Sequence, residues 1–399
     1  MLRVLTLSTL YPNGHQPTLG LFVERQTLGL AARDDIEVRV VAPVGLPVWP
    51  LSWHPHYRPL TRLAARETWN GLVVHRERFT VWPGGGAHLA AREMVRGLSG
   101  LFNHIDFAFD VIDAEFFWPD GVAAMHLAAR HNVPFSIKAR GSDIYHWGDQ
   151  PRIGDQIRAA ADAADGLLAV SASLKQEMVA RGIPADKIKV HQTGVDLDRF
   201  KPGDRQKAKA ELGVEGPLIA TVGALIERKG QSFALDALAR LPGATLLLVG
   251  EGPDRAALKK QAERLGITKR VRFVGAQPPE QVARLVAAAD VMLLPTRAEG
   301  IANAWVEALA CGTPVVTCDA GGAREVIDRP EAGRVAERDA GDLARAVTEV
   351  LASPPAQEAV RRAAERFSWE RNAEELEAHL RTMVQSHQSG KGLRSVLPA

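Results

Sequence analysis

The chain has 399 residues, which is too long for one ordinary domain and enough for two of about 180 to 200 residues each. Hydrophobic residues make up 46% and charged residues 24%, a composition typical of globular proteins and not of disordered ones. The formal net charge of +2 argues against a general nucleic-acid-binding protein, and the sequence contains no run of about 18 apolar residues that would span a membrane.

The first segments predict an alternation of strand and helix. Residues 4–7 and 36–42 are apolar enough for buried strands, and residues 21–32 between them predict a helix. The loop 8–20 is rich in Pro, Gly and Asn but lacks G-x-G-x-x-G, so bare dinucleotide binding is not expected at this end. The apolar part of residues 1–10 is too short for a secretion signal, and a first buried strand is the better interpretation.

Residues 45–105 interrupt this alternation with a concentration of tryptophan and arginine. Half of the eight tryptophans lie here, and the segment holds seven arginines against three glutamates. The interleaved aromatic and basic residues are Trp49, Trp53, Trp69, Trp82, Arg58, Arg62, Arg66, Arg76, Arg78, His54 and His56. One interpretation is a folded excursion whose tryptophans pack inward. The other is a contact with an anionic membrane surface or a lipid-linked acceptor, because Trp and Arg both suit such an interface.

Regular alternation then resumes and predicts a parallel sheet with helices on both faces. The expected strands are residues 111–114, 135–138, 167–170 and 188–191. The expected helices are residues 119–131, 152–164 and 172–181. The motif RGSDI at 140–144 directly follows a strand, which places it at the carboxyl edge of the sheet. The best domain boundary is the junction at 194–204. Its Asp196-Leu197-Asp198 spells the metal-binding pattern D-x-D, but a turn or helix cap is the favoured interpretation in a linker.

The second half repeats the plan around a strand–turn–helix–strand unit at residues 291–322. The expected strands are residues 218–222, 245–249, 271–274, 291–294 and 315–318. In the central unit the polar turn 296–300 follows a strand, and the helix 302–310 is stopped by a glycine and a proline. The turn therefore lies at the carboxyl edge of a parallel sheet, where open α/β folds bind ligands. Cys311 and Cys318 are expected to be small buried hydrophobes, not a disulfide or a metal site.

Two carboxylates stand out in the central unit, Glu299 in the turn and Glu307 two turns into the helix. Taken singly, each has an ordinary explanation: an acid near a helix start meets the helix dipole, and an acid within a helix lies at its edge. Together they flank a helix N-terminus whose free N–H groups attract phosphate, and carboxylates accept hydrogen bonds from sugar hydroxyls. The pair therefore fits a nucleotide sugar better than a metal or a bare phosphate.

A second candidate for phosphate binding is the loop between Gly223 and Gly230. Small residues let backbone amides approach a diphosphate, and Arg228 and Lys229 supply positive charge. A lysine in a solvated loop is the ordinary alternative. Because this loop also follows a strand, it belongs at the carboxyl edge of the sheet, and Lys229 becomes the leading stabiliser of a departing phosphate.

Motifs in order along the chain closely resemble those of the retaining glycosyltransferases of family 4, least well between residues 45 and 105. They are E-x7-E within PTRAEGIANAWVEALACGTPVV, GALIERKG at 223–230, GEGPDR at 250–255, VRFVG at 271–275 and TGVDLDRFKP at 193–202, with a looser match at RGSDI. The resemblance implies the GT-B arrangement, an α/β fold of two Rossmann-like, doubly wound parallel-sheet domains that face a cleft. It also implies a hexosyltransferase that moves a sugar from a nucleoside diphosphate sugar to a hydroxyl group with retained anomeric configuration, without a metal or a bound cofactor.

The resemblance implies roles for individual residues. Lys229, Arg228 and Glu299 would be catalytic, Glu299 would hold the donor sugar, and Glu307 would bind the ribose. The other donor-binding residues would be Gly223, Gly250, Glu251, Gly300, Ile301, Ala302 and Asn303. The residues on the acceptor side would be Gly20, Arg140 and Asp143.

The chain departs from the family in two places. Ala224 stands where the family usually has arginine, and Arg140 stands where it commonly has histidine. Residues 1–197 are expected to form the acceptor-side domain and residues 198–374 the nucleotide-sugar-binding domain. By resemblance, the tail from about 375 to 399 packs back on the first domain.

The expected partners are a nucleotide-sugar donor and a glycan or lipid-linked acceptor of cell-surface polysaccharide synthesis, with no nucleic acid. The expected location is the cytoplasm, with peripheral contact at the inner face of an anionic membrane as the sharper hypothesis. Two alternatives stay open. An epimerase or phosphorylase could share the fold, although E-x7-E argues against both. A non-catalytic two-lobed sugar-binding protein is the other, and the missing secretion signal argues against its periplasmic version.

Overall fold

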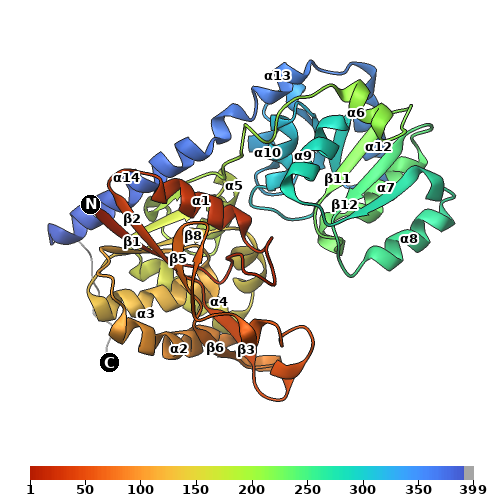
Figure 1. Ribbon diagram of the computed structural model, residues 1–399. Helices are drawn as coiled ribbons and strands as arrows, with labels where there is room; N and C mark the ends of the chain where they lie inside the picture. Colours follow the sequence, from red (N-terminus) through yellow and green to blue (C-terminus); the bar gives the residue numbers. More distant parts are fainter. Residues whose placement is uncertain (391–399) are drawn as a thin grey trace. The chain divides into compact units, whose positions relative to one another are not determined.

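The computed structural model describes residues 1–390 and divides into two compact units (Figure 1). Unit 1 combines residues 1–194 with the C-terminal residues from 369 onward, and unit 2 consists of residues 195–368. The boundaries expected from the sequence, after residue 197 and at about residue 375, each fall a few residues later than these. The last part of the expected tail, residues 391–399, lies outside the described residues.

Unit 1 is built on an eight-stranded sheet with the order β10-β9-β8-β7-β1-β2-β5-β4. Its strands are β1 (Leu2–Leu7), β2 (Ile36–Val41), β4 (Arg66–Trp69), β5 (Leu72–His75), β7 (Val111–Ala114), β8 (Phe135–Ala139), β9 (Gly166–Ala169) and β10 (Ile188–Val190). Neighbouring strands are parallel except β4 and β5. The chain passes from β1 to β2 on one side and later continues at β7 on the other, so the strand order reverses between β1 and β7. At such a switch point, open α/β sheets bind ligands beyond the carboxyl ends of their strands.

The two faces of this sheet pack against different helices, because alternate residues of a strand point to opposite faces. The longer helices are α1 (Leu21–Ala31), α2 (Ala90–His104), α3 (Val122–His131), α4 (Pro151–Ala163), α5 (Ala172–Ala180) and α14 (Trp369–Gln388). Leu5 and Leu7 join the core made with α2, α3 and α4, whereas Leu2 and Val4 join the core made with α1 and α14. Helix α14 lies along α1 (Figure 1), and Arg33 of the chain after α1 bonds to Glu377 at 2.7 Å (Nε to Oε2).

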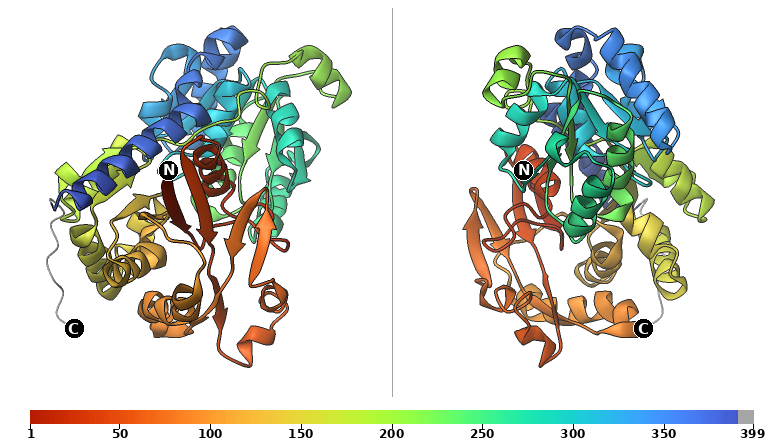
Figure 2. Two further views of the ribbon diagram at one scale, coloured as in Figure 1. Left: turned by 60° about the vertical axis from the view of Figure 1, so that its left-hand side comes forward. Right: turned by 90° about the vertical axis from the view of Figure 1, so that its right-hand side faces the viewer.

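The segment after β2 contains elements that the sequence analysis did not predict. Strands β3 (Val44–Pro47) and β6 (Arg78–Val81) form a separate parallel pair, and β4 and β5 form a hairpin whose turn is Asn70-Gly71. Both turn residues have positive φ, 46° and 85°, which Asn and Gly adopt most readily. Beyond the β3–β6 pair, the loop extends away from the rest of unit 1 (Figures 1 and 2).

The tryptophans of this segment do not pack inward as one interpretation predicted. Trp49, Trp53 and Trp82 are 75%, 71% and 42% exposed. Trp69 is the exception: it is half-buried, and its Nε1 donates to Oε1 of Glu24 at 2.6 Å. The inward-packing interpretation is therefore wrong for three of the four tryptophans.

Unit 2 is built on a six-stranded parallel sheet with the order β13-β12-β11-β14-β15-β16. Its strands are β11 (Leu218–Val222), β12 (Thr245–Val249), β13 (Val271–Gly275), β14 (Val291–Leu294), β15 (Val315–Cys318) and β16 (Gly333–Ala336). Its helices are α6 (Arg205–Glu211), α7 (Gln231–Ala239), α8 (Arg255–Arg264), α9 (Pro279–Ala288), α10 (Asn303–Ala310), α11 (Ala323–Val326), α12 (Ala340–Ala352) and α13 (Gln357–Arg361). The five strands predicted from the sequence are present, and β16 is an additional one. The strand order of unit 2 reverses between β11 and β14, so these two strands mark its switch point.

The structure also describes the two thiols, the turn at Asp196 and the lengths of the helices. Cys311 and Cys318 are buried free thiols in apolar surroundings, and burial raises the pKa of both. Asp196 of the D-x-D pattern closes a turn, since its Oδ1 accepts from the backbone N–H of Arg199 at 3.0 Å and its Oδ2 lies 3.3 Å from the guanidinium of that residue. Within residues 1–390, every helix is too short or too polar to cross a membrane.

Candidate active site

The first candidate site lies at the switch point of unit 2, where the loops after β11 and β14 meet. The β11 loop ends in a short helical turn that carries Arg228 and Lys229. Nζ of Lys229 lies 2.6 Å from Oε1 of Glu299 in the β14 loop, and a guanidinium nitrogen of Arg228 lies 3.3 Å from the same oxygen. Gly230 allows this approach, because its φ is 75° and a Cβ there would lie 2.1 Å from the carbonyl oxygen of Pro295.

The loop that carries Glu299 is held by further contacts. The hydroxyl of Thr296 donates to Oε1 of Glu299 at 3.0 Å, so this one oxygen is shared by three donors. The backbone N–H of Gly322 donates to the carbonyl of Gly300 at 2.8 Å, and a Cβ on Gly321 would lie only 1.6 Å from the carbonyl oxygen of Glu299. Thr296 and Gly321 were not singled out from the sequence, although each lies two or three residues after a buried strand.

Helix α10 begins immediately after this loop and carries Glu307. Ile301 and Ala302 before the helix are buried, and Asn303 opens it. Glu307 is partly exposed and makes no hydrogen bond or ion pair with any side chain in residues 1–390 that would occupy its carboxylate. Burial raises the pKa of Glu307 to about 7, and the positive charge of Arg199 opposes this shift. On another face of α10, the indole N–H of the fully buried Trp305 has no hydrogen-bond partner among the described residues.

The glycines that were predicted to bind the donor allow their loops to pack closely together. Gly223 and Gly250 have φ of 149° and 140°, and a Cβ on Gly250 would lie 2.1 Å from the carbonyl oxygen of Gly223. The two loops after β11 and β12 therefore lie directly against one another. Glu251 is differently placed: its carboxylate is exposed and pairs with Arg255 of α8 at 2.5 Å. Its proposed contact with a donor would have to compete with this ion pair.

The residues predicted on the acceptor side belong to unit 1, and their contacts are internal. A Cβ on Gly20 would lie 2.2 Å from the carbonyl oxygen of Leu10, so this glycine closes the loop after β1. The carboxylate of Asp143 is fully buried and accepts from the backbone N–H groups of Phe117, Gly141 and Arg140 at 2.8 to 3.1 Å. Asp143 therefore holds the loops after β7 and β8 in place instead of presenting a free carboxylate to an acceptor.

Arg140 is likewise committed to the interior of unit 1. It forms an ion pair with Glu115, which is completely buried, and its guanidinium lies 4.9 Å from the ring centroid of Phe22. Only 7% of the Arg140 side chain is exposed. The positive charges of Arg140 and Lys138 hold the pKa of Glu115 below its usual value against the effect of burial. Arg140, which stands where the family commonly has histidine, thus pairs with a buried carboxylate.

A buried lysine completes this group of charges and was missed from the sequence. Nζ of Lys138 donates to Oε1 of Gln26 at 2.6 Å and lies 2.8 Å from Nδ1 of His191. Burial lowers the pKa of Lys138 well below its usual value. Its position in the otherwise apolar strand β8 could have drawn attention to it, because a lysine on a buried strand needs partners.

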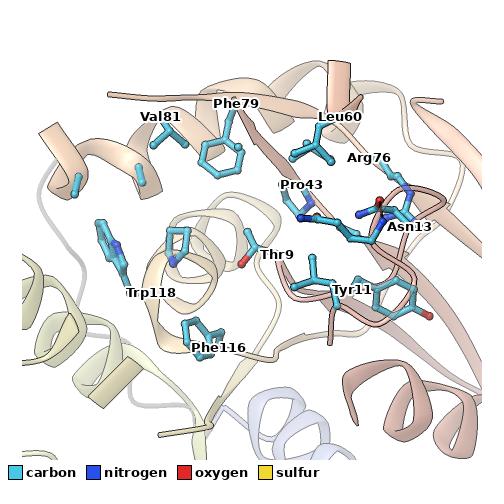
Figure 3. Close-up of a pocket in the computed structure, with 18 of the residues that line it drawn as sticks. Thr9, Tyr11, Asn13, Pro43, Leu60, Arg76, Phe79, Val81, Phe116 and Trp118 are labelled. Atoms are coloured by element: carbon cyan, nitrogen blue, oxygen red, sulfur yellow. Dashed lines mark hydrogen bonds between the residues drawn. The ribbon is translucent and has the colours of Figure 1, made fainter. Parts of the chain in front are cut away.

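A cavity of about 360 Å³ lies at the switch point of unit 1, and we call it the inner cavity (Figure 3). It is bounded by the loops after β1, β2 and β7 and by the β3–β6 pair. Its lining includes Thr9, Tyr11, Phe79, Phe116, Trp118 and Trp147. The backbone N–H and hydroxyl of Thr9 donate to Oδ2 of the buried Asp120 at 2.9 and 3.2 Å, which ties the β1 loop to the β7 loop. Burial raises the pKa of Asp120 to about 7.

Among residues 1–390, no three His, Cys, Asp or Glu side chains come together as metal ligands would. The cations nearest to Glu299 are those of Lys229 and Arg228.

Known protein families match both parts of the chain. The family described as "Glycosyl transferases group 1" matches residues 203–367, and "Glycosyltransferase Family 4" matches residues 19–199. The D-inositol 3-phosphate glycosyltransferase of Mycolicibacterium smegmatis is 34% identical over 292 residues, which are 67% of this chain and 66% of that protein. The protein of the same name from Segniliparus rotundus is 37% identical over 213 residues, 50% and 47% of the two chains. The matched regions thus span about half to two thirds of these relatives.

Solved structures of the same fold cover nearly the whole chain. Sucrose-phosphate synthase from Thermosynechococcus elongatus gives a TM-score of 0.80 at 20% identity, with 97% of this chain and 100% of that chain covered. Anabaena HepE, solved in complex with UDP, gives a TM-score of 0.72 at 21% identity and covers 96% and 100%. At these identities the likeness shows the fold.

Proposed function

Because the chain belongs to the family 4 glycosyltransferases, with the two Rossmann-like domains of the GT-B fold, we propose that it transfers a sugar from a nucleoside diphosphate sugar to a hydroxyl group. The observation that carries this proposal is the bond between Lys229 and Glu299 at the switch point of unit 2. It sets a cation and a carboxylate beside the N-terminus of α10, which attracts phosphate. In this proposal the anomeric configuration is retained, as is usual in the family.

The leaving nucleoside diphosphate gains negative charge as the sugar–phosphate bond breaks. Lys229 and Arg228 both face the oxygen of Glu299, so a diphosphate that enters beside this carboxylate meets two cations already in place. A preorganised cation lowers the barrier more than it aids ground-state binding, because the charge on the phosphate grows in the transition state. Glu299 then accepts hydrogen bonds from hydroxyls of the donor sugar.

Glu307 is proposed to hold the ribose of the donor. Glu307 lies about one turn into α10 and is partly exposed as a residue, and its carboxylate is not engaged by another described side chain. A carboxylate accepts two hydroxyl hydrogen bonds from a ribose, and such bonds to a charged group are stronger than neutral ones.

No metal takes part in the proposed reaction. The roles that a divalent cation would have at a diphosphate, charge neutralisation and orientation, are assigned to Lys229, Arg228 and the N–H groups at the start of α10. Activity should therefore persist in a chelator.

Two kinds of acceptor are candidates. The curated relatives are named for D-inositol 3-phosphate. A lipid-linked or polysaccharide acceptor of cell-surface glycan synthesis is favoured here by the exposed Trp49, Trp53 and Trp82, since exposed tryptophans suit a membrane interface. In this proposal the protein works at the cytoplasmic face of an anionic membrane.

The full-length protein tests this proposal when incubated with radiolabelled UDP-, GDP- and ADP-sugars. Release of the nucleoside diphosphate, dependent on a hydroxyl acceptor, is the expected result for one of them. Isomerised donor without nucleotide release would indicate an epimerase, phosphate-dependent release a phosphorylase, and donor binding without any turnover a sugar-binding protein. Each of these three outcomes would overturn the proposal.

A further inference from the structure

The inner cavity occupies the same topological position in unit 1 that the Lys229–Glu299 pair occupies in unit 2. Both lie beyond the carboxyl ends of the strands at which the strand order reverses. Loops at such a point enclose a crevice because the chain leaves the two neighbouring strands in opposite directions. Position alone therefore marks the cavity as a ligand site, and its lining shows which chemistry it accepts.

The lining of the inner cavity is mainly apolar and aromatic. Phe79 of β6 and Phe116 and Trp118 of the β7 loop contribute aromatic side chains (Figure 3). Trp147 at the end of the β8 loop adds another, and Val44 and Val81 of the β3–β6 pair add aliphatic surface. Tyr11 also lines the cavity, and its hydroxyl is buried without a partner among the described residues. A space of this kind gains free energy by taking up hydrocarbon from water.

The one cation among the lining residues is already paired. Arg76 is 1% exposed, its Nε forms an ion pair with Glu67, and one of its terminal nitrogens donates to the carbonyl of Pro12 at 2.6 Å. Its guanidinium also lies 5.8 Å from the ring centroid of Trp69. A phosphate group in the cavity would find no uncommitted positive charge there, so the cavity is poorly suited to an inositol phosphate.

The lining continues outward to the exposed tryptophans. Phe79 lines both the inner cavity and a second cavity of about 610 Å³. This outer cavity is also lined by apolar residues that include Leu46, Pro47 and Trp49, and by the charged Arg78, Glu93 and Arg96. Strand β3 thus lines the inner cavity with its first residues and the outer cavity with its last ones, and then leads to Trp49, which is 75% exposed. Strand β3 therefore connects the exposed Trp49 with the inner cavity at the switch point.

We propose that the inner cavity is an acceptor subsite that binds the hydrocarbon part of a lipid-type acceptor. This inference rests on the proposed function, because it assumes that the chain has an acceptor. It assigns the hydrocarbon to the inner cavity and excludes a free inositol phosphate from it. The hydroxyl that receives the sugar then lies beside the partly exposed polar lining residues Thr9 and Gln16.

The test measures binding of n-alkyl β-glucosides to the full-length protein by calorimetry, with methyl, butyl, hexyl and octyl chains below their micelle concentrations. Affinity is expected to rise about threefold to fourfold for each added methylene and to level off once the cavity is full. D-inositol 3-phosphate is expected not to displace the octyl glucoside. Equal affinity of the wild type for methyl and octyl glucosides would overturn the inference. Displacement of octyl glucoside by the inositol phosphate would also overturn it.

A variant whose larger side chain fills the inner cavity provides the second part of the test. Ala87 lines the inner cavity, so Ala87→Phe should remove most of the chain-length dependence, whereas Ala64→Phe at an exposed position in the same segment should keep it. If both variants bind octyl glucoside like the wild type, the hydrocarbon binds elsewhere and the inference is wrong.

Nucleotide release on the same preparations separates this inference from the proposed function. Turnover of a donor without chain-length dependence overturns the inference alone. Absence of turnover with every donor overturns the proposed function, and with it the assignment of the cavity to an acceptor.

Discussion

The ammonium group of Lys229 lies 2.6 Å from Oε1 of Glu299, although the two residues are 70 positions apart in the chain. Each follows a different strand, β11 or β14, and the sheet of unit 2 brings these strands together as neighbours at its switch point. Arg228 and Thr296 bind the same carboxylate oxygen. The carboxylate thus keeps two cations in place.

Glu299→Gln should separate nucleotide binding from sugar transfer. Loss of the negative charge leaves Lys229 and Arg228 free for phosphate, so a nucleoside diphosphate should bind at least as tightly as to the wild type. Transfer should fall about 100-fold, because an amide holds the sugar hydroxyls less well and no longer positions the lysine. Calorimetry and initial rates give the two values. Glu227→Gln, an exposed carboxylate in the neighbouring loop, should alter neither, and weaker nucleotide binding in Glu299→Gln would contradict this role.

Glu307→Ala should weaken donor binding by roughly 1.5 to 3 kcal/mol, the contribution of hydrogen bonds to a charged group. Titration of the nucleotide with the variant by calorimetry measures this directly. Unchanged nucleotide affinity would show that Glu307 is only an edge residue of α10.

The raised pKa of Glu307 predicts a pH dependence with a definite sign. Since burial raises this pKa to about 7, the carboxylate is mostly protonated at pH 6 and mostly ionised at pH 8. A ribose that needs the ionised form should bind roughly tenfold more tightly at pH 8 than at pH 6. The nucleoside of the active donor is the suitable probe, because it carries no titrating phosphate. Glu307→Gln serves as the control, and an equal pH dependence in this variant would assign the effect to another group.

The raised pKa of Glu307 also makes the stability of the folded protein depend on pH: donor binding should strengthen as the pH rises, whereas stability should fall. A carboxyl group whose pKa is raised on folding contributes its stability below its unfolded pKa and loses it as the pH rises through about 7. Melting temperatures of the free protein should therefore decline more between pH 5 and pH 8 for the wild type than for Glu307→Gln. A parallel decline for both proteins would contradict the burial of this carboxyl group.

The exposed tryptophans predict binding to anionic vesicles. The wild type should float with vesicles that contain anionic lipid, and added salt should weaken this binding because the arginines of the segment contribute. Trp49→Ser combined with Trp53→Ser should reduce flotation severalfold, whereas Val179→Ser, an exposed apolar residue of α5, should not. Equal flotation with neutral and anionic vesicles, or none with either, would remove the membrane from the account.

The buried ion pair of unit 1 predicts a large effect on stability. Arg140→Ala leaves the charge of the fully buried Glu115 without its nearest partner, which costs about 3 to 5 kcal/mol. Calorimetric melting should show the transition of unit 1 lowered by roughly 5 to 15 °C. Arg152→Ala, an exposed arginine of α4, is the matched control and should melt like the wild type. An unchanged transition in Arg140→Ala would mean that Lys138 alone neutralises Glu115.

The strands of unit 2 were predictable because each is a continuous apolar run ended by Gly, Pro or a polar turn. This held for β14 and β15, whose bounds agree with the prediction. Strand β16 was missed, since Gly333–Ala336 is four residues long and contains an arginine. The β4–β5 hairpin was also missed, although Asn70-Gly71 between two apolar pairs is a strong hairpin pattern that could have identified it.

The sequence could predict which residues come directly after strands, and therefore lie at the carboxyl edge of a sheet, but not which of them touch. Lys229 and Glu299 could be assigned to one sheet edge, but their direct bond depends on which strands are neighbours, and sequence order alone does not give this. For Asp143 the same reasoning was insufficient, because its position after β8 fits both an open site and a buried contact. The structure shows a buried contact, with backbone N–H groups around the carboxylate.

The inner cavity could not be predicted from the sequence for a related reason. Its walls come from the loops after β1, β2 and β7 and from the unpredicted β3–β6 pair. The concentration of tryptophan was visible, but whether those side chains face solvent depends on the path of the excursion.

The turnover of Lys229→Ala with a nucleoside diphosphate sugar tests the central claim most directly. The account predicts a kcat at least about 100-fold below that of the wild type, because one preorganised cation at the leaving phosphate is lost. Lys260→Ala, an exposed lysine of α8, should turn over normally, and wild-type activity should survive EDTA. Normal turnover by Lys229→Ala, or activity abolished by EDTA and restored by magnesium, would contradict the account.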